Sequence, residues 1–179
     1  MVAGAVMHTV EVQLADVDRG VYETLNLRMA QHPSETSAFM MTRLLAYCLE
    51  YADGIVFSEG VAATDEPAVL VRDATGSVTV WIEVGAPDAE RLHRGSKLAD
   101  RTVIYSHRDP ARLLPLWAGK KIHHASEITL HSFDPGFIDA AAATIARRNT
   151  ASLSVMEGQL YLDINGQSLT SALHTVPIA

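Results

Sequence analysis

Three carboxylates stand close together in the sequence, at the two ends of a predicted pair of strands. Asp65 and Glu66 come just before the apolar segment 68–72, and Glu83 lies near the end of the segment 78–84. Carboxylates brought close together repel one another unless they share a proton or hold a cation. Ligand sets made only of oxygen favour Mg²⁺ or Mn²⁺ over zinc. These residues therefore predict a site for a hard divalent cation.

The pairing of the two strands decides which acid lies beside Glu83. The segment DATG between them is typical of a turn, so the strands are predicted to form a hairpin. Alternation puts Glu83 on the same face as Trp81, where a covering helix would bury it. A symmetric turn centred on 74–75 sets Glu66 opposite Glu83, and a one-residue bulge sets Asp65 there. The same acids are also compatible with a solvated turn and an exposed strand end.

The elements around this hairpin follow from hydrophobic periodicity and from turn residues. Strands are expected where apolar residues alternate, and helices where they recur every three or four positions. We predict strands at 7–15, 23–29, 68–72, 78–84, 102–107, 127–132, 152–157 and 159–164, and helices at 36–52, 87–100, 110–119 and 134–148. The fold class is α/β with α+β margins: a mixed sheet flanked by helices, with hairpins at both ends. A single domain over residues 1–179 is expected.

Composition limits the location of the protein. Hydrophobic residues make up 48% of the 179, and no run of about 18 apolar residues is present, so no membrane span is expected. The opening MVAGAVMHTVEVQL lacks a basic segment and a long apolar segment, which predicts a cytoplasmic protein without a secretory signal. The only cysteine, Cys48, has apolar neighbours, which indicates a buried side chain rather than a nucleophile.

The charge argues against bulk attraction to nucleic acid. The formal net charge is -7, so nucleic-acid binding would need a local basic groove or a bound cation. A short basic run, Lys120, Lys121, His123 and His124, is compatible with phosphate contact or with a solvated turn. The two histidines are adjacent, so in an extended segment they point to opposite faces and do not share a metal. Nucleotide-binding loops, hydrolase elbows and CxxC pairs are absent from the sequence.

Five short segments, in order and at similar spacing, resemble the characteristic segments of the bacterial YaeQ family. They are HPSET at 32–36, RLLAY at 43–47, YAD at 51–53, DEP at 65–67 and WIEVGAPD at 81–88. The resemblance covers nearly the whole chain. It implies a variant of the PD-(D/E)XK nuclease fold, which is restriction-endonuclease-like and holds a metal between an Asp entering one strand and a Glu on the next.

The resemblance assigns roles to individual residues. Asp65 or Glu66, together with Glu83, match the metal-binding positions in order and in hairpin context. Glu35 matches a glutamate that many such nucleases carry on their first helix. Its position at the start of a predicted helix is equally compatible with a favourable interaction with the helix dipole. His32 is expected to fix the loop before that helix; the alternative is that it approaches the acids and supports them by a hydrogen bond.

The sequence departs from the nuclease pattern at two positions. Ala68 follows Pro67 where the pattern has an aspartate, and Gly85 stands where the pattern has its lysine, two residues after Glu83. That lysine would orient or activate water and stabilise charge on phosphate. The candidate replacements lie on the next predicted helix: Arg91, Arg94 and Lys97. An arginine stays protonated and would bind phosphate without acting as a base.

Two functions follow as hypotheses. The first is a Mg²⁺- or Mn²⁺-dependent nuclease-like phosphodiesterase in which a cluster of acids binds the metal and a basic residue replaces the missing lysine. Its residues are Asp65, Glu66 and Glu83 as ligands, Glu35 assisting, and Arg91, Arg94 or Lys97 as the cation. The alternative is a degenerate PD-(D/E)XK-like domain that binds nucleic acid or a protein. A third interpretation makes the acids structural, and it is favoured if Glu83 pairs with a buried arginine.

Overall fold

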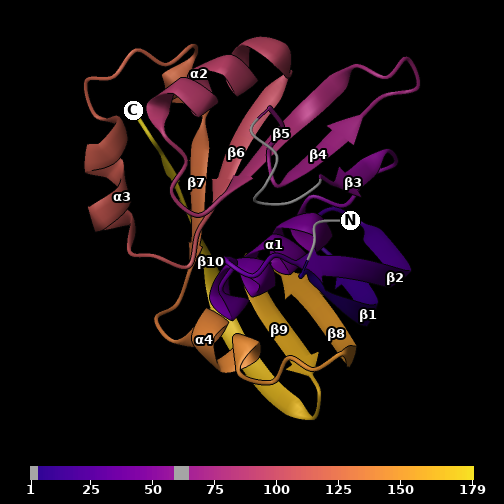
Figure 1. The fold of residues 1–179 in the computed structure, drawn as a ribbon. Coiled ribbons are helices and arrows are strands. Elements are labelled where there is room, and N and C mark those ends of the chain that lie inside the picture. The colour runs from indigo at the N-terminus through magenta and orange to yellow at the C-terminus, as the bar shows by residue number, and fades with distance from the viewer. Residues whose placement is uncertain (1–3, 59–64) are drawn as a thin grey trace.

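The computed structural model describes residues 4–58 and 65–179. Within this part of the chain, ten strands form one mixed sheet that curves around helix α1 (Figure 1). In chain order the elements are β1 (Val6–Asp16), β2 (Val21–Gln31), α1 (Ser37–Leu49), β3 (Ile55–Phe57), β4 (Val69–Arg72), β5 (Val78–Val84), α2 (Ala89–Leu98), β6 (Arg101–Tyr105), α3 (Pro110–Trp117), the 3-10 helix η2 (Ala125–Glu127), β7 (Thr129–Phe133), α4 (Phe137–Ala142), β8 (Arg148–Met156), β9 (Gln159–Ile164) and β10 (Gln167–Pro177).

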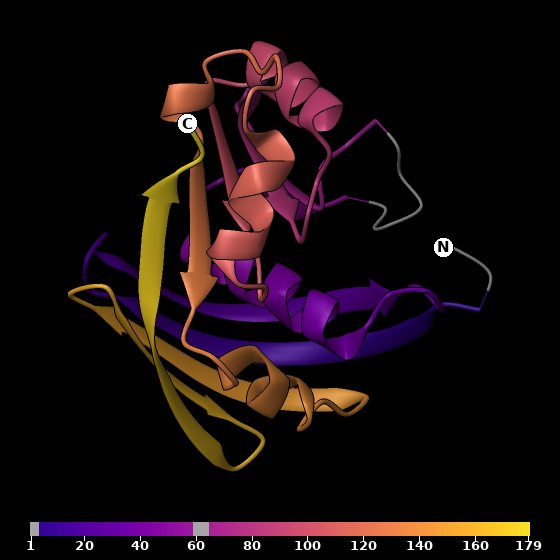
Figure 2. The same cartoon turned by 90° about the vertical axis from the view of Figure 1, so that its left-hand side faces the viewer.

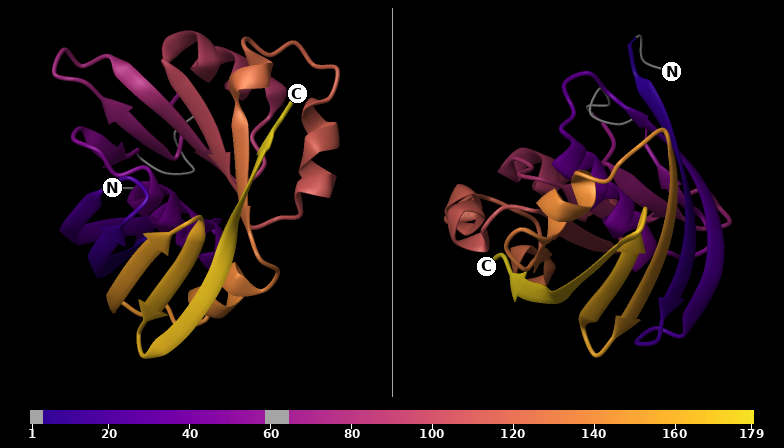
Figure 3. Two further views of the ribbon diagram at one scale, coloured as in Figure 1. Left: turned by 180° about the vertical axis from the view of Figure 1, so that it is seen from behind. Right: turned by 90° about the horizontal axis from the view of Figure 1, so that it is seen from below.

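The sheet has two halves that share strand β10. The strand order is β2-β1-β8-β9-β10-β7-β6-β5-β4-β3. β1 is parallel to β8, and β5, β6 and β7 are parallel to one another, whereas the remaining neighbours are antiparallel. Residues 167–172 of β10 pair with β9 and residues 173–177 pair with β7. Figures 2 and 3 show β10 rising from one half of the sheet to the other.

Helix α1 lies inside the curve of the sheet. The hydroxyl of Thr36 accepts a hydrogen bond from the N–H of Phe39 at 3.0 Å, which caps the first turn. Nine of the 13 residues of α1 are buried, as expected for a helix surrounded by other elements. Cys48 is among them, and burial raises the pKa of its thiol to about 12. The prediction of a buried cysteine side chain is confirmed.

Helices α2 and α3 cover the opposite face of β5, β6 and β7. Strand alternation divides β6: Val103 belongs to the core around α1, and Ile104 belongs to a second core under α2 and α3. That second core consists of Leu92, Ile104, Leu113, Trp117, Ile128, Leu130 and Ile178. We call residues 89–127, from α2 to η2, the helical layer. It is visible at the upper left of Figure 1.

Most predicted elements are present, with small shifts at their ends. The N-terminal hairpin, α1, the hairpin of β4 and β5, the alternation of helices and strands from α2 to β7, and the hairpin of β8 and β9 are all confirmed. Mixed pairing and flanking helices are confirmed as well. Long antiparallel hairpins make up so much of the sheet that the fold is α+β rather than α/β. In the part of the chain described, no helix is long and apolar enough to span a membrane.

Two predictions about the C-terminal part were wrong. The helix expected over 134–148 is only Phe137–Ala142, because the chain leaves the helix at Ala143 and Arg148 already begins β8. Strand β10 was not predicted. Its sequence QSLTSALHTVP lacks a clear apolar alternation because its two ends pair in different halves of the sheet, and only Ser171 is buried within it.

Candidate functional site

Glu83 is held by an arginine of the next helix. Its Oε2 accepts hydrogen bonds from Nε of Arg91 at 3.0 Å and from Nε1 of Trp81 at 3.1 Å, and its Oε1 accepts one from Nη2 of Arg91 at 3.2 Å. The Glu83 side chain is 4% exposed and the Arg91 side chain 25%. A buried carboxylate needs such compensation, and the two-point guanidinium contact supplies it.

The close approach of α2 to β5 produces this contact. Asp88 caps α2 by accepting a hydrogen bond from the N–H of Arg91 at 2.8 Å, so Arg91 lies in the first turn, beside the end of β5. One turn later, an added Cβ at Gly95 would lie 2.5 Å from the indole of Trp81. A glycine is therefore needed where the helix crosses the ring. This packing fixes Arg91 over Glu83.

The acids before β4 do not lie opposite Glu83 in the hairpin. Val69 pairs with Ile82 and Leu70 with Trp81, so the same register continued by one residue sets Ala68 opposite Glu83. Both predicted registers were wrong. The turn is closed by the N–H of Asp73 on the carbonyl of Ser77, and an irregularity follows between Val71 and Arg72. Each feature moves the pairing by one residue.

Glu66 still contacts the Glu83 group, through its backbone. Nη2 of Arg91 donates to the carbonyl oxygen of Glu66 at 2.8 Å. The carboxylate of Glu66 is 3.6 Å from Nη2 of Arg72, in an ion pair whose two side chains are about 40% exposed (43% and 39%). Asp65 is exposed. Arg91 thus joins the two predicted strand segments through the Glu83 carboxylate and the Glu66 carbonyl.

Gly85 has a backbone conformation that does not suit a lysine. Its φ is +91°, and an added Cβ would lie 3.0 Å from Cε2 of Phe39 on α1. Its N–H donates to the carbonyl of Tyr105 at 2.9 Å, which fixes the position in the sheet. The lysine that the nuclease pattern has at this position does not suit this fold, because the positive φ would strain any side chain and the ring of Phe39 would crowd it.

Glu35 lies on the other face of the sheet and pairs with Arg43, and its carboxylate also accepts a hydrogen bond from the N–H of His32 at 3.2 Å. Nε of Arg43 donates to Oε2 of Glu35 at 3.0 Å, and its Nη2 donates to Oε1 at 3.1 Å and to the carbonyl of Ala30 at 2.9 Å. The two side chains are 2% and 0% exposed. Because α1 packs on the face of β5 that carries Ile82, Glu35 and Glu83 belong to different faces.

The remaining predicted cations lie further along α2. Arg94 is half-buried one turn after Arg91, and Lys97 is exposed in the last turn. Six residues of helix separate Lys97 from Arg91, which is about 9 Å along the axis. Lys97 lies instead near His123, whose pKa is lowered by desolvation first and then by His124, His93 and Lys97. Of the three predicted replacements, Arg91 is the one that contacts Glu83.

The residues as they lie do not fit a metal site. Among residues 4–58 and 65–179, no group of three or more His, Cys, Asp or Glu side chains is arranged to hold a metal ion. The guanidinium of Arg91 occupies the position beside Glu83 that a cation would take. The charge of Glu83 is therefore balanced by the protein itself.

A second buried polar group was not predicted from the sequence. Glu50, at the end of α1, is 8% exposed and pairs with Arg101, and its Oε2 accepts a hydrogen bond from the Tyr105 hydroxyl at 2.5 Å. Burial raises the pKa of Tyr105 well above its usual range, and the Glu50 carboxylate raises it further. The Tyr105 ring stacks on His131 with centroids 4.6 Å apart. This group joins α1 to β6 and β7. The one signal for it in the sequence is an acid, Glu50, at the end of a predicted apolar helix.

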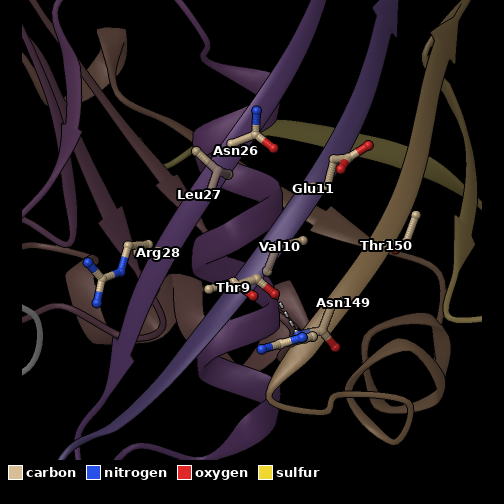
Figure 4. A pocket seen from close by; sticks show the side chains of 9 residues that line it. Thr9, Val10, Glu11, Asn26, Leu27, Arg28, Asn149 and Thr150 are labelled. Carbon is tan, nitrogen blue, oxygen red and sulfur yellow. Dashed lines mark hydrogen bonds between the residues drawn. The ribbon is translucent and has the colours of Figure 1, made fainter.

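One hollow lies on the outer face of β1, β2 and β8, away from all these residues (Figure 4). Its volume is about 440 Å³, and Glu11 lies in it together with Arg28 and Arg148. Asn149 at its edge donates to the carbonyl of Thr9 at 3.0 Å. Its charges are mixed, so this surface does not select a ligand of either sign.

Replacing Arg91 by alanine is expected to lower the free energy of unfolding by about 2 kcal/mol, because Glu83 stays buried without its cation. Urea denaturation followed by circular dichroism measures the change. Arg72→Ala is the matched control, since its ion pair with Glu66 is exposed and should contribute less than about 0.5 kcal/mol. Equal effects of the two substitutions would contradict a structural role for the Arg91 pair.

Comparison with known proteins gives one consistent result. The family model described as YaeQ protein matches residues 1–173. The chain is 28% identical to the uncharacterized protein YaeQ of Escherichia coli K12 over 173 residues, covering 94% of each chain. The corresponding protein of Salmonella typhi is 28% identical over 166 residues, covering 90% of each.

Two crystal structures have the same fold. The YaeQ protein from Pseudomonas syringae aligns with a TM-score of 0.86 and 28% identity, covering 98% of this chain and 97% of that one. The YaeQ protein from Xanthomonas axonopodis pv. citri aligns with a TM-score of 0.84 and 29% identity, covering 96% and 97%. The resemblance carried by the five short segments thus extends over the whole fold.

Proposed function

Since this chain belongs to the YaeQ family, we propose that it is a nuclease-like domain of the PD-(D/E)XK kind that has lost cleavage and binds the phosphate backbone of nucleic acid. Three features support the loss of cleavage. Arg91 takes the position of a cation beside Glu83, Ala68 rather than an acid continues the register opposite it, and Gly85 excludes the lysine. An arginine stays protonated, so no base replaces that lysine.

The observation that supports nucleic-acid binding is the segregation of charge. The helical layer holds eight of the 14 Lys and Arg residues but only four of the 21 Asp and Glu residues, a formal charge of +4, or +2 once the pairs of Arg91 with Glu83 and of Arg101 with Glu50 are set aside. The other residues, six basic and 17 acidic, carry a charge of -11. A local field of this kind attracts a polyanion although the net charge of the chain is -7.

The three lysines of the chain lie at one end of this layer. Lys97, at the end of α2, and Lys120 and Lys121, after α3, are exposed. His93 and His123 connect the two segments, because Nδ1 of His93 accepts a hydrogen bond from the N–H of His123 at 2.9 Å. Exposed lysines without base-reading partners contact phosphates rather than base edges, so binding with little sequence preference is expected.

The test is fluorescence anisotropy with labelled single-stranded DNA, duplex DNA and RNA at several salt concentrations. Lys97→Gln/Lys120→Gln/Lys121→Gln is expected to weaken binding at least about tenfold at low salt. Each lysine removed from a phosphate should reduce the slope of log K against log salt by about one. The readout is therefore both an affinity and a salt slope.

The matched control removes the same charge from another surface. Arg28, Arg147 and Arg148 are exposed and lie outside the helical layer, so Arg28→Gln/Arg147→Gln/Arg148→Gln should bind as the wild type does. If both triple variants lose affinity equally, the attraction is not local and the proposal fails. Absence of binding by the wild type at low salt would reject it as well.

The metal-dependent phosphodiesterase is the second candidate, and the burial of Glu83 beside the Asp65 and Glu66 segment favours it. It requires a cation to displace Arg91. Calorimetric titration of Mn²⁺ into the wild type, Arg91→Ala and Glu83→Gln distinguishes the two functions. Binding by the wild type that is lost in Glu83→Gln supports the enzyme. Binding only by Arg91→Ala, or by none of the three, supports the domain that does not cleave.

A further inference from the structure

The loop after β6 and the first turns of α3 form a hollow with a chemistry of its own. Its volume is about 610 Å³, and its lining residues are Arg108, Asp109, Arg112, Leu113 and Leu116. The loop lies at the carboxyl end of β6, between the parallel strands β5 and β7. Loops at the carboxyl ends of parallel strands are the usual place for ligands in such sheets.

Neither of the two arginines of the hollow forms an ion pair with a carboxylate of a described residue. Arg108 and Arg112 are exposed and four residues apart, and no described residue accepts a hydrogen bond from either guanidinium. By contrast, the described structure pairs a carboxylate with each of Arg19, Arg43, Arg72, Arg91 and Arg101. Asp109 lies between the two, but its Oδ1 accepts a hydrogen bond from the N–H of Ala111 at 2.9 Å to cap α3. The hollow therefore has a positive charge to offer.

Two leucine side chains line the hollow beside the two arginines. Leu116 follows Arg112 by four residues and is 50% exposed, while Leu113 is 1% exposed and forms the floor. Residues four apart lie on the same side of a helix, so Arg112 and Leu116 lie on one side of α3, and Arg108 lies in the loop just before the cap residue Asp109. A leucine half exposed beside two arginines suits a ligand that joins an anion to an apolar group.

We infer that this hollow binds a phosphate monoester that carries an apolar or aromatic group. A phosphate monoester brings up to two negative charges and three terminal oxygens, enough to contact two guanidinium groups at once, whereas a single carboxylate brings one charge and two oxygens. The volume lies within the range of small-ligand pockets. The site is independent of the nucleic-acid proposal, which depends on lysines at the other end of the helical layer.

The probes are phenyl phosphate and inorganic phosphate, titrated by calorimetry into the full chain. Phenyl phosphate is expected to bind about tenfold more tightly than inorganic phosphate, because its ring rests on the leucines. Arg108→Gln/Arg112→Gln should abolish binding of both probes. Leu116→Ser should remove the tenfold advantage and leave the binding of inorganic phosphate unchanged. Circular dichroism of each variant checks that it is folded.

Arg147→Gln/Arg148→Gln is the matched control, because it removes two neighbouring exposed arginines from another surface. Binding that falls equally in both arginine variants, or an undetectable interaction with millimolar phenyl phosphate, overturns the inference. Equal affinities for the two probes in the wild type overturn the apolar part. A 5′-phosphorylated dinucleotide, with its unphosphorylated form as the control, identifies the source of the phosphate. Tighter binding of the phosphorylated dinucleotide than of phenyl phosphate indicates the end of a nucleic-acid strand, and weaker binding indicates a small metabolite. Both results support the site.

Discussion

Replacing Arg43 by alanine is expected to lower the free energy of unfolding by about 3–5 kcal/mol. The side chain makes three hydrogen bonds inside the curve of the sheet, two to Glu35 and one to the carbonyl of Ala30. Without it, Glu35 would keep a buried charge, because its side chain is 0% exposed. The loss of packing against Phe57, whose ring centroid is 5.4 Å from the guanidinium carbon, adds to the effect.

Urea denaturation of Arg43→Ala, followed by circular dichroism, measures this change. Arg28→Ala is the control on an exposed strand position, where less than about 0.5 kcal/mol is expected. Glu35→Gln/Arg43→Met should recover much of the loss, since it removes both charges and keeps the volume. A loss below about 1 kcal/mol in Arg43→Ala would show that Glu35 is balanced in another way, and its assignment as a site residue would regain support.

The sequence predicted the elements better than their ends. α1 was predicted because the apolar residues Met41, Leu44, Leu45 and Cys48 recur at helical spacing, and all four are buried in the structure. The shared strand β10 was missed, since a strand that pairs in two halves of a curved sheet has no single buried face. Hydrophobic periodicity detects a strand whose one face is buried along its whole length, whereas the two ends of β10 lie in different environments.

The candidate site shows the same limit at the level of single residues. Alternation correctly put Glu83 and Trp81 on one buried face, and the buried acid has a partner in Arg91. The identity of the partner depended on how closely α2 approaches β5, which the contact of Gly95 with Trp81 sets. Sequence spacing could place Arg91 near Glu83 but could not decide between an arginine and a metal.

The register of the hairpin was beyond the reach of sequence for a similar reason. One residue in the turn and one irregularity at Arg72 moved the acids by two positions, so that neither Asp65 nor Glu66 lies opposite Glu83. Strand register is specified by side chains that must be buried, and acids at a strand entry impose no such demand. The predicted cluster of acids therefore depended on the register of the β4–β5 hairpin, which the sequence specifies only weakly.

Restoring the lysine of the nuclease pattern by Gly85→Lys is expected to destabilise the protein by about 3 kcal/mol without creating a nuclease. A side chain at φ +91° is strained, which costs about 1–3 kcal/mol, and its Cβ would meet the Phe39 ring at 3.0 Å. Glu83 would still be paired with Arg91, so the new lysine would not have a metal-bound water beside it to activate.

Two comparisons separate these causes. Gly119→Lys imposes a similar strain, because φ is +72° there, but nothing lies within 4 Å of its added Cβ, so it should cost only the strain. Gly85→Lys/Phe39→Ala should lose the contact and keep the strain, after correction for Phe39→Ala alone. Unfolding in urea measures all four variants, and cleavage of labelled DNA and RNA with Mn²⁺ is assayed beside it. If the Gly85→Lys protein is as stable as the wild type and cleaves either substrate, a single substitution restores cleavage. That result would refute the proposal that this domain has lost its metal site and its nuclease activity.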